Sequence, residues 1–398
     1  MSRIAIVGAK RNPFGKFMGT LAGMNATELA LESSKAALLQ STLSPQDIDA
    51  TVFGNVIQSA VDAIYLPRHV GLKLGVPMDR PALGVNRLCG SGFEAITQGA
   101  YLLQHEGMNC VLVGGAESMS QVPYVLRGAR AGYRMGPGEV EDYLTAALTD
   151  SHVKLPMALT AENLAEKYGI SRETVDEYSL KSQKRAAAAW ERGFFKNEVA
   201  PIVLESKKGK LEFSRDEHLR PESNKESIAK LPALFKKGGT VHAGSSSGIV
   251  DGAASLILCT ESFAKSRKLT PLAFVESWGF VGCDPSMMGI GPVPAAKKAL
   301  EKLSLSRGRK FSISDMKRVE INEAFAAQYL AVERELELDP EKTNVNGGAI
   351  AIGHPLAASG ARLTSTLIYE LKAQGGGFGL AAACIGGGQG MAVIIEVV

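Results

Sequence analysis

The amino-acid sequence repeats one pattern in its two halves, and this repeat restricts the possible folds more than any other feature. A Ser-x-x-Asp turn at residues 44–47 precedes a predicted strand, and a second such turn at residues 312–315 precedes another. About thirty residues after each strand, a glycine-flanked residue opens a helix: Cys89 in one half and His354 in the other. Each helix leads to an apolar strand that ends in glycines. Two related α/β units explain this pattern, and chance similarity between βαβ segments is the alternative.

Apolar strand patterns alternate with helical patterns through most of the chain. This alternation predicts an α/β fold with parallel strands and layered helices. Residues 122–240 interrupt it with two predicted helices and a charged span, so we expect an inserted loop domain over the core. The predicted domains are a first half at 1–121 and 241–269, the insertion at 122–240, and a second half at 270–398.

The composition argues against several classes of protein. The chain has 398 residues, 45% of them hydrophobic, and its net charge of +3 gives no sign of a nucleic-acid binder. No apolar run reaches the roughly 18 residues that a membrane span needs. Five cysteines without Cys-x-x-Cys spacing predict neither a disulfide framework nor a metal site. Residues 1–27 are basic without an acid, as in a transit peptide, but residues 3–8 predict a buried strand that cleavage would damage.

Cys89 is the first candidate for a reactive group. It lies in Asn-Arg-Leu-Cys-Gly-Ser-Gly at residues 86–92, directly before an apolar helical pattern. A thiolate at a helix N-terminus gains from free N–H groups and from the helix dipole, and glycines let a substrate approach the backbone closely. Taken alone, the stretch is explained equally well by a buried structural cysteine beside tight glycine turns.

Three later segments favour the functional interpretation. His354 lies in a glycine-rich run before Pro355, at a predicted strand-to-helix junction like that of Cys89. A histidine beside a cysteine can take the proton of the thiol. Cys384 ends an apolar strand in a denser glycine loop, which suggests an additional proton carrier. Asn322 ends the repeated strand, where its amide can bind a water or an oxyanion. A core histidine and a helix-capping asparagine are the structural alternatives.

One cysteine and one histidine also suit a hydrolase or a protease. The stretch Cys89-Gly-Ser-Gly92 is similar to the Cys-Gly-Ser-Cys signature of papain-like proteases. Here a glycine replaces the second cysteine, no tryptophan follows, and the cysteine lies far from the N-terminus. These departures argue against a protease.

Taken together and in this order, the segments resemble those of the thiolase family along essentially the whole chain. The matching stretches are NRLCGSGFEAI around Cys89, GGAESMS at 114–120, NEAFAAQ from 322, NGGAIAIGHPLAASGAR from 346 and CIGGGQGMA from 384. In detail they are most similar to those of mitochondrial-type 3-ketoacyl-CoA thiolases. The resemblance implies two halves, each with a mixed five-stranded sheet, in a homodimer or homotetramer. It also implies coenzyme A (CoA) as a substrate, with no permanently bound cofactor and no metal.

The resemblance implies a role for each site residue. Cys89 would carry the acyl group, His354 would activate it and help bind the thioester oxygen, and Cys384 would move the proton at the α-carbon. Asn322 would orient a water in one oxyanion hole, and the backbone N–H groups of Cys89 and Gly386 would form the other. The residues expected to bind CoA or substrate are Arg220, Ser223, Ala243, Ser247, Met157 and Phe325. Further candidates for CoA phosphates, with a solvated charged loop as the alternative, are Lys207, Lys208 and Lys210.

The implied reaction is cleavage of a 3-ketoacyl-CoA by CoA into acetyl-CoA and a shortened acyl-CoA, as in fatty acid β-oxidation. Pro156 precedes Met157 where many acetoacetyl-CoA-restricted relatives carry histidine, which favours broader chain lengths. A biosynthetic acetoacetyl-CoA-forming thiolase, an acyl-CoA hydrolase and a lipid carrier on the same fold are the alternatives. The expected partners are CoA and acyl-CoA thioesters, without nucleic acid or a membrane span. The expected location is the mitochondrial matrix, with the cytoplasm as the alternative.

Overall fold

Strands from both halves of the chain join into one mixed sheet in the computed structural model, which describes residues 3–206 and 209–398. The strand order is β14-β15-β16-β13-β1-β12-β5-β3-β4, and β2 pairs with β12. The pairs β3–β4, β3–β5 and β14–β15 are parallel. The bounds are β1 (Ile4–Arg11), β2 (Gly15–Lys16), β3 (Ala50–Gly54), β4 (Ala82–Val85), β5 (Cys110–Glu117), β12 (Val250–Thr260), β13 (Ala273–Gly282), β14 (Arg318–Ile321), β15 (Gly377–Ile385) and β16 (Gln389–Val397).

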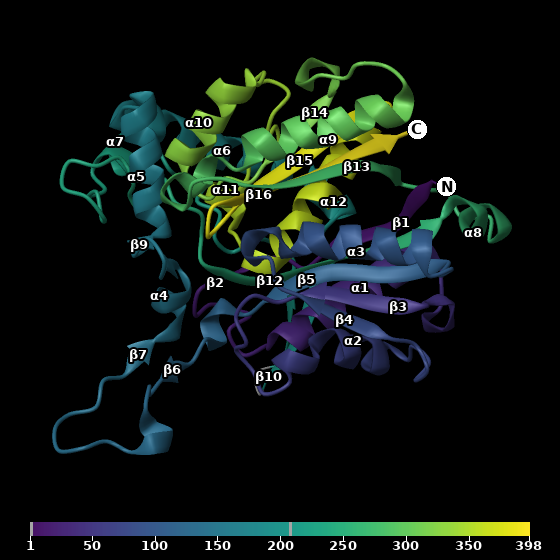
Figure 1. Cartoon of the computed structure of the whole chain (residues 1–398), viewed down its shortest axis with the longest axis horizontal. Helices are drawn as coiled ribbons and strands as arrows, with labels where there is room; N and C mark the ends of the chain where they lie inside the picture. The colour runs from purple at the N-terminus through teal and green to yellow at the C-terminus, as the bar shows by residue number, and fades with distance from the viewer. Residues whose placement is uncertain (1–2, 207–208) are drawn as a thin grey trace.

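The two halves meet at the antiparallel pair β1–β13, and helices lie on both sides of the sheet (Figure 1). Helices α3 (Ser91–His105) and α12 (Ser359–Ala373) lie between the strands of the first half and those of the second. The outer face of the first half is covered by α1 (Ala26–Ser41) and α2 (Leu66–Leu74), and that of the second half by α9 (Pro292–Arg307) and α10 (Ala326–Leu336). Strands near the centre are therefore covered on both faces.

This burial on both faces explains why the central strands are continuous apolar runs. In β12, Leu256 and Leu258 point toward α3 and α12, whereas Ile257 and Cys259 point toward α1. Alternate side chains enter different cores, so neither set needs to be polar.

The internal repeat predicted from the sequence is present in the structure. Both Ser-x-x-Asp segments form single 3-10 turns, in which Asp47 and Asp315 accept hydrogen bonds from the backbone N–H of Ser44 and Ser312 at 2.9 and 2.8 Å. Each turn leads into the parallel strand of its half, β3 or β14. The mixed α/β fold with two like halves is confirmed.

The second half differs from the expected five strands. Within the described residues it contributes four strands, β13 to β16, and the place of a fifth beside β14 is taken by a single bridge between Val319 and Thr343. The reason lies in Asn344, whose backbone is left-handed at φ 48° and turns the chain away from the sheet. Its side-chain amide bonds both backbone groups of Ile321 at 2.9 Å, in place of a further strand.

The region predicted as an insertion, residues 122–240, stays outside the main sheet but is spread over both halves. Helices α5 (Met157–Tyr168) and α6 (Arg172–Glu191) pack into the core of the second half, as Figure 1 shows. The hairpin β10–β11 (Ile202–Ser206, Gly209–Phe213) packs instead on the outer core of the first half. Shorter elements are α4 (Tyr143–Ala147), α7 (Lys225–Ala229), β6 (Tyr124–Val125), β7 (Glu141–Asp142), β8 (Thr149–Asp150) and β9 (Leu155–Pro156).

An arm at residues 124–142, closed by the β6–β7 pair, projects away from the body of the molecule (Figure 1). Across residues 3–206 and 209–398, no helix combines the length and the apolar character needed to cross a bilayer.

Candidate active site

The N-terminal ends of α3 and α12 meet where the two halves of the molecule face each other. Cys89 lies in the 3-10 turn Leu88–Gly90 before α3, and His354 lies just before the turn Leu356–Ala358 that leads into α12. The two turns contact each other because glycines remove side chains between them. A Cβ atom on Gly92 would lie 2.8 Å from the carbonyl oxygen of Ala357. The internal repeat thus brings its two distinctive residues together.

Cys89 is presented on a strained turn. Leu88, directly before it, has a left-handed backbone with φ 46°, which is uncommon for a residue other than glycine. The Asn86 side chain accepts from the Leu88 N–H at 3.0 Å and supports this conformation. Burial raises the pKa of the Cys89 thiol to about 11, although the N–H groups of Gly386 and of Cys89 itself favour the thiolate. The resting group is therefore a thiol whose sulfur already faces two N–H donors.

His354 is buried and held in one tautomer. Its Nδ1 lies 2.5 Å from the Ser359 hydroxyl, which donates to the carbonyl of Pro355 at 3.0 Å. The serine oxygen can therefore only accept from the ring, so Nδ1 carries the proton and Nε2 presents its lone pair. Burial and the charge of Arg362 lower the pKa of His354 to about 3, so the imidazole is neutral. It is a base that shares a cavity wall with the half-buried Cys89 thiol.

One sequence expectation about His354 is wrong. The segment before it is the single-turn helix α11 (Ala349–Ile352), so His354 does not lie at a strand-to-helix junction. A short apolar run between glycines is compatible with either a strand or a buried helical turn, and periodicity alone does not separate them. In the structure this turn packs against α6.

Asn322 and Cys384 lie on neighbouring strands of the second half. Asn322 directly follows β14, and its amide nitrogen is 3.3 Å from Nε2 of His354. The other amide atom, Oδ1, is buried and has no hydrogen-bond partner in the described part of the chain. Cys384 lies one residue before the end of β15, among Met288, Ala324 and Met157. Burial first, and then the nearby Cys89, raise the pKa of Cys384 well above its usual value, so this group is a protonated thiol.

A cavity of about 360 Å³ joins these groups. Its walls contain Cys89, His354 and Cys384 together with three of the predicted substrate residues, Ser247, Met157 and Phe325. No Asp, Glu, Lys or Arg is among its lining residues that the structure describes. The other lining side chains are mainly apolar: Met119, Thr145, Leu148, Thr149, Pro156, Ala158, Phe235, Ser246, Ile249, Met288, Ala324 and Leu356. Such a wall suits a hydrocarbon chain that ends at a reactive carbonyl.

The remaining predicted residues lie elsewhere. Asn322 is directly behind His354, and Gly386 contacts Cys89 through its N–H. Arg220 and Ala243 are exposed and Ser223 is half-buried, all three outside the cavity wall. Lys210 lies on the β10–β11 hairpin and pairs with Glu205, so the structure does not bring it to the cavity. Lys207 and Lys208 lie outside the described residues.

Two buried carboxylates that we did not single out from the sequence fasten the chain on either side of His354. Glu117 accepts from the N–H groups of Ile57 and Ala357 at 3.0 and 3.1 Å, and burial raises its pKa to about 7. Glu323 accepts from the N–H of Ile350 at 3.1 Å. An acid at the end of an otherwise apolar strand is the signal that could have identified both. Among residues 3–206 and 209–398, no three His, Cys, Asp or Glu side chains are grouped to bind a metal ion.

Comparison with known proteins gives the same picture over the full chain. The family model for the thiolase N-terminal domain matches residues 4–262, and that for the thiolase C-terminal domain matches residues 269–397. The chain is 52% identical to the mitochondrial 3-ketoacyl-CoA thiolase of Homo sapiens, over 99% of this chain and 98% of that protein. It is 42% identical to an acetyl-CoA acetyltransferase of Chromobacterium violaceum, over 99% of each.

Solved structures of the human enzyme superpose closely on this one. The crystal structure of human mitochondrial 3-ketoacyl-CoA thiolase matches with a TM-score of 0.97 at 52% identity, covering 100% of this chain and 99% of that one. The same enzyme in complex with CoA matches with a TM-score of 0.96, covering 100% and 98%. Both domain models match, half of the residues are identical to those of the human enzyme, and the fold is shared over the whole length. This chain therefore belongs to the thiolase family.

Proposed function

We propose that the chain is an acetyl-CoA C-acyltransferase that cleaves 3-ketoacyl-CoA with CoA to acetyl-CoA and a chain-shortened acyl-CoA, as in fatty acid β-oxidation. The observation that carries this proposal is the placement of Cys89, His354 and Cys384 in the wall of one apolar cavity. The relatives that are 52% identical are named 3-ketoacyl-CoA thiolase, which supports the same activity. CoA is a substrate in this reaction, and the site needs no permanently bound cofactor.

In the first half-reaction, Cys89 attacks the C3 carbonyl carbon of the 3-ketoacyl-CoA and transfers its proton to Nε2 of His354. The C2–C3 bond then breaks, leaving an acyl group on Cys89 and the enolate of acetyl-CoA. Cys384 donates its proton to C2, which gives acetyl-CoA. Both thiols and the imidazole rest in their neutral forms, so proton transfer accompanies the attack.

In the second half-reaction, the CoA thiol gives its proton to the Cys384 thiolate and attacks the acyl-Cys89 thioester. The shortened acyl-CoA leaves, and the released Cys89 thiolate takes back its proton from His354, so all three groups return to their resting forms. Negative charge develops on carbonyl oxygens in both halves. We assign the N–H groups of Cys89 and Gly386 to one oxyanion hole, and His354 with a water on Asn322 to the other. The unpartnered Oδ1 of Asn322 and the Gly386 contact to Cys89 support this assignment.

We propose that CoA enters past the loop at residues 243–249. Ser247 lies in the cavity wall beside Met157 and Phe325, and Ala243 and Arg220 are exposed for the outer part of the molecule. Arg220 suits a phosphate because its guanidinium forms charge-assisted hydrogen bonds. Ser223 lies three residues further on, in the same segment.

The cavity predicts activity beyond the four-carbon substrate, because Pro156 contributes an apolar wall without a polar group at its tip. We expect kcat/KM for six- and eight-carbon 3-ketoacyl-CoA to stay within about tenfold of the best chain length. A thiolysis assay over chain length measures this and also tests the proposed function.

Replacing Pro156 by histidine is expected to reduce kcat/KM for the longer chains selectively, with Pro156→Ala as the matched control. Activity on acetoacetyl-CoA alone would favour the biosynthetic alternative, and release of free acid without acetyl-CoA would identify a hydrolase.

We further propose that the chain forms homodimers through the edge strand β4, and tetramers through the projecting arm. Leu83 on β4 is 41% exposed, Met78 just before this strand is 83% exposed, and Val61 between β3 and α2 is 99% exposed, which is unfavourable for an open edge. The arm likewise exposes Tyr124 and Met135. We expect light scattering to give a dimer or tetramer, and Leu83→Lys to lower the mass toward a monomer while Met135→Ser breaks only the tetramer. A monomeric wild type would contradict this.

The mitochondrial matrix is our proposal for the location, since the human relative is named mitochondrial. Of the basic N-terminal residues, Lys10 and Arg11 are part of β1, which lies in the middle of the sheet between β12 and β13. Imaging of a C-terminally tagged chain tests this location against the cytoplasm. We retain the division into residues 1–121 with 241–269, 122–240, and 270–398 as a proposal.

A further inference from the structure

His242 is a buried histidine that lies outside the cavity wall, at the start of the loop that carries two of the proposed CoA contacts. Its side chain is fully buried. The chain after it passes Ala243 and reaches the cavity at residues 246–249. Nothing in the proposed acyl transfer uses this imidazole, so its burial requires a separate explanation.

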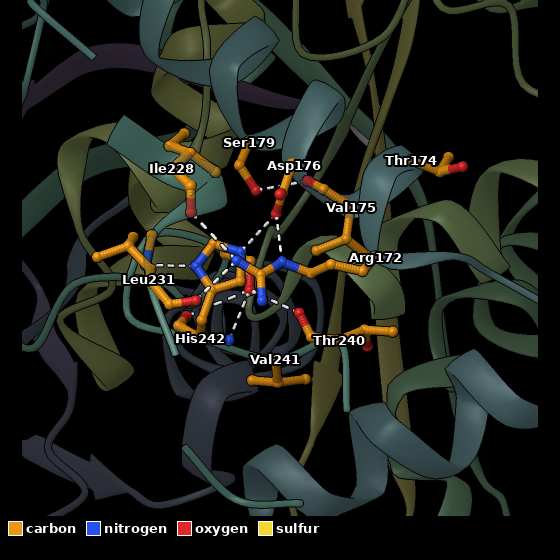
Figure 2. Close-up of polar contacts among 12 residues, drawn as sticks. Arg172, Thr174, Val175, Asp176, Ser179, Ile228, Leu231, Thr240, Val241 and His242 are labelled. Carbon is orange, nitrogen blue, oxygen red and sulfur yellow. Dashed lines mark hydrogen bonds and ion pairs between the residues drawn. The ribbon is translucent and has the colours of Figure 1, made fainter. Parts of the chain in front are cut away.

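Both ring nitrogens of His242 are engaged. The backbone N–H of Gly244 donates to Nδ1 at 3.1 Å, so Nδ1 has no proton and the proton lies on Nε2. Nε2 is 2.8 Å from Oδ1 of Asp176 on α6, and Figure 2 shows this contact. The imidazole of His242 therefore closes the turn at residues 242–244 and fastens that turn to α6.

Asp176 connects the loop to a second segment at the mouth of the site. Its Oδ1 also accepts from Nε of Arg172 at 2.7 Å, and Nη2 of Arg172 donates to the carbonyl groups of Ile228 and Leu231 at 3.1 and 2.8 Å (Figure 2). This second segment follows Ser223 and continues to Phe235 in the cavity wall. The chain His242–Asp176–Arg172 thus ties both CoA-facing segments to α6.

The two segments also pack directly on each other. A Cβ atom on Gly244 would lie 2.8 Å from Cδ1 of Leu231, and the Leu234 N–H donates to the Val241 carbonyl at 3.2 Å. The turn at residues 242–244 therefore lies against the segment around Leu231, and we expect a shift of one to disturb the other.

The catalytic end of the same loop is held independently of His242. The Ser247 N–H donates to the Ala324 carbonyl at 2.9 Å, and the His354 N–H donates to the Gly248 carbonyl at 2.9 Å. On the other side, Glu162 accepts from the N–H of Val241 at 2.7 Å. Loss of the His242 imidazole therefore removes the connection of residues 242–244 to α6 and leaves His354 in place, while Ser245 and Ser246 still bond the His242 backbone.

We propose that His242, acting with Asp176 and Arg172, is a positioning residue that sets the shape of the CoA-binding mouth and thereby the affinity for CoA, without a part in acyl transfer. This inference rests on the proposed function in one respect: the ligand whose affinity it controls is CoA. It touches neither substrate nor reacting atoms, so its removal is expected to change KM for CoA and not kcat.

The test compares substitutions of His242 in the full chain, using KM and kcat for thiolysis and the Kd of CoA by calorimetry. We expect His242→Ala to raise KM and Kd for CoA about tenfold, with kcat within about twofold of wild type. His242→Asn can still accept from Gly244, and His242→Gln can still donate to Asp176, so each is expected to recover part of the affinity. The matched control is His105→Ala, an exposed histidine at the end of α3, which should leave all three quantities unchanged.

Several outcomes would overturn the inference. One is an unchanged Kd for CoA in folded His242→Ala. Another is an equal loss of kcat and affinity, as in a generally damaged enzyme, and a third is no recovery in either the Asn or the Gln variant. If His242→Ala does not fold, the Asn and Gln variants carry the test, and wild-type affinity in both would overturn it. A wild-type protein that binds CoA but shows no thiolysis would contradict the proposed function instead. The two failures can be distinguished because calorimetry measures the Kd of CoA without any turnover.

Discussion

Cys384→Ala is expected to keep the exchange of label between acyl-CoA and free CoA while losing thiolysis of 3-ketoacyl-CoA by about 10²-fold or more, the scale of a general acid–base group. Exchange needs only acylation of Cys89 and its reversal, with no proton transfer at carbon. Thiolysis also needs a proton at C2 of the departing enolate. In the structure, Cys384 is a buried, protonated thiol close to Cys89, as that role requires. The measurement is the pair of rates on one variant.

Two companion variants separate chemistry from packing. Cys384→Ser nearly conserves the side-chain volume but is a far weaker acid, so it should behave like Cys384→Ala if proton transfer is the cause. Cys89→Ala should lose exchange and thiolysis together, because no acyl-enzyme can form. If folded Cys384→Ala loses both rates equally, or keeps thiolysis, the division of labour between the two cysteines is wrong.

Gly115→Ala is the second substitution with a large expected effect. A Cβ atom at Gly115, near the end of β5, would overlap the carbonyl oxygen of Ala357, three residues after His354. The contact is with backbone, so the turn must move away from Glu117, which binds the Ala357 N–H at 3.1 Å. We expect a loss of about 3 kcal/mol in the free energy of unfolding, from overpacking. We also expect kcat/KM to fall by about 10²-fold, since small displacements of catalytic groups are costly.

Gly23→Ala is the matched control, because no atom lies within 4 Å of a Cβ at that position. It should leave the melting temperature and kcat/KM close to wild type. Chemical denaturation gives the stability change, and steady-state thiolysis on the folded fraction gives the activity change. A Gly115→Ala protein with wild-type stability and activity would show that the turn before α12 does not depend on this close approach.

Local pattern was sufficient for most of the elements and for choosing the candidate residues of the site. Ser171 caps the N-terminus of α6 and the left-handed Gly193 follows its end, and the capped turns at residues 44–47 and 312–315 reveal the repeat. Such features depend on neighbours a few residues apart, so a sequence displays them directly. Cys89, His354 and Cys384 are visible for the same reason, since each stands beside glycines in a distinctive run.

Long-range contacts were not visible in the same way. The pKa of Cys89 is raised, although its helix-start position alone favours a thiolate, because burial by segments distant in sequence outweighs the helix end. Asn344 replaces a fifth strand, Lys210 lies away from the cavity, and Glu117 and His242 fasten segments far apart in the chain. Each outcome depends on which surfaces meet after the two halves pack together. Packing energy and desolvation are set by residues distant in sequence, and no local window contains them.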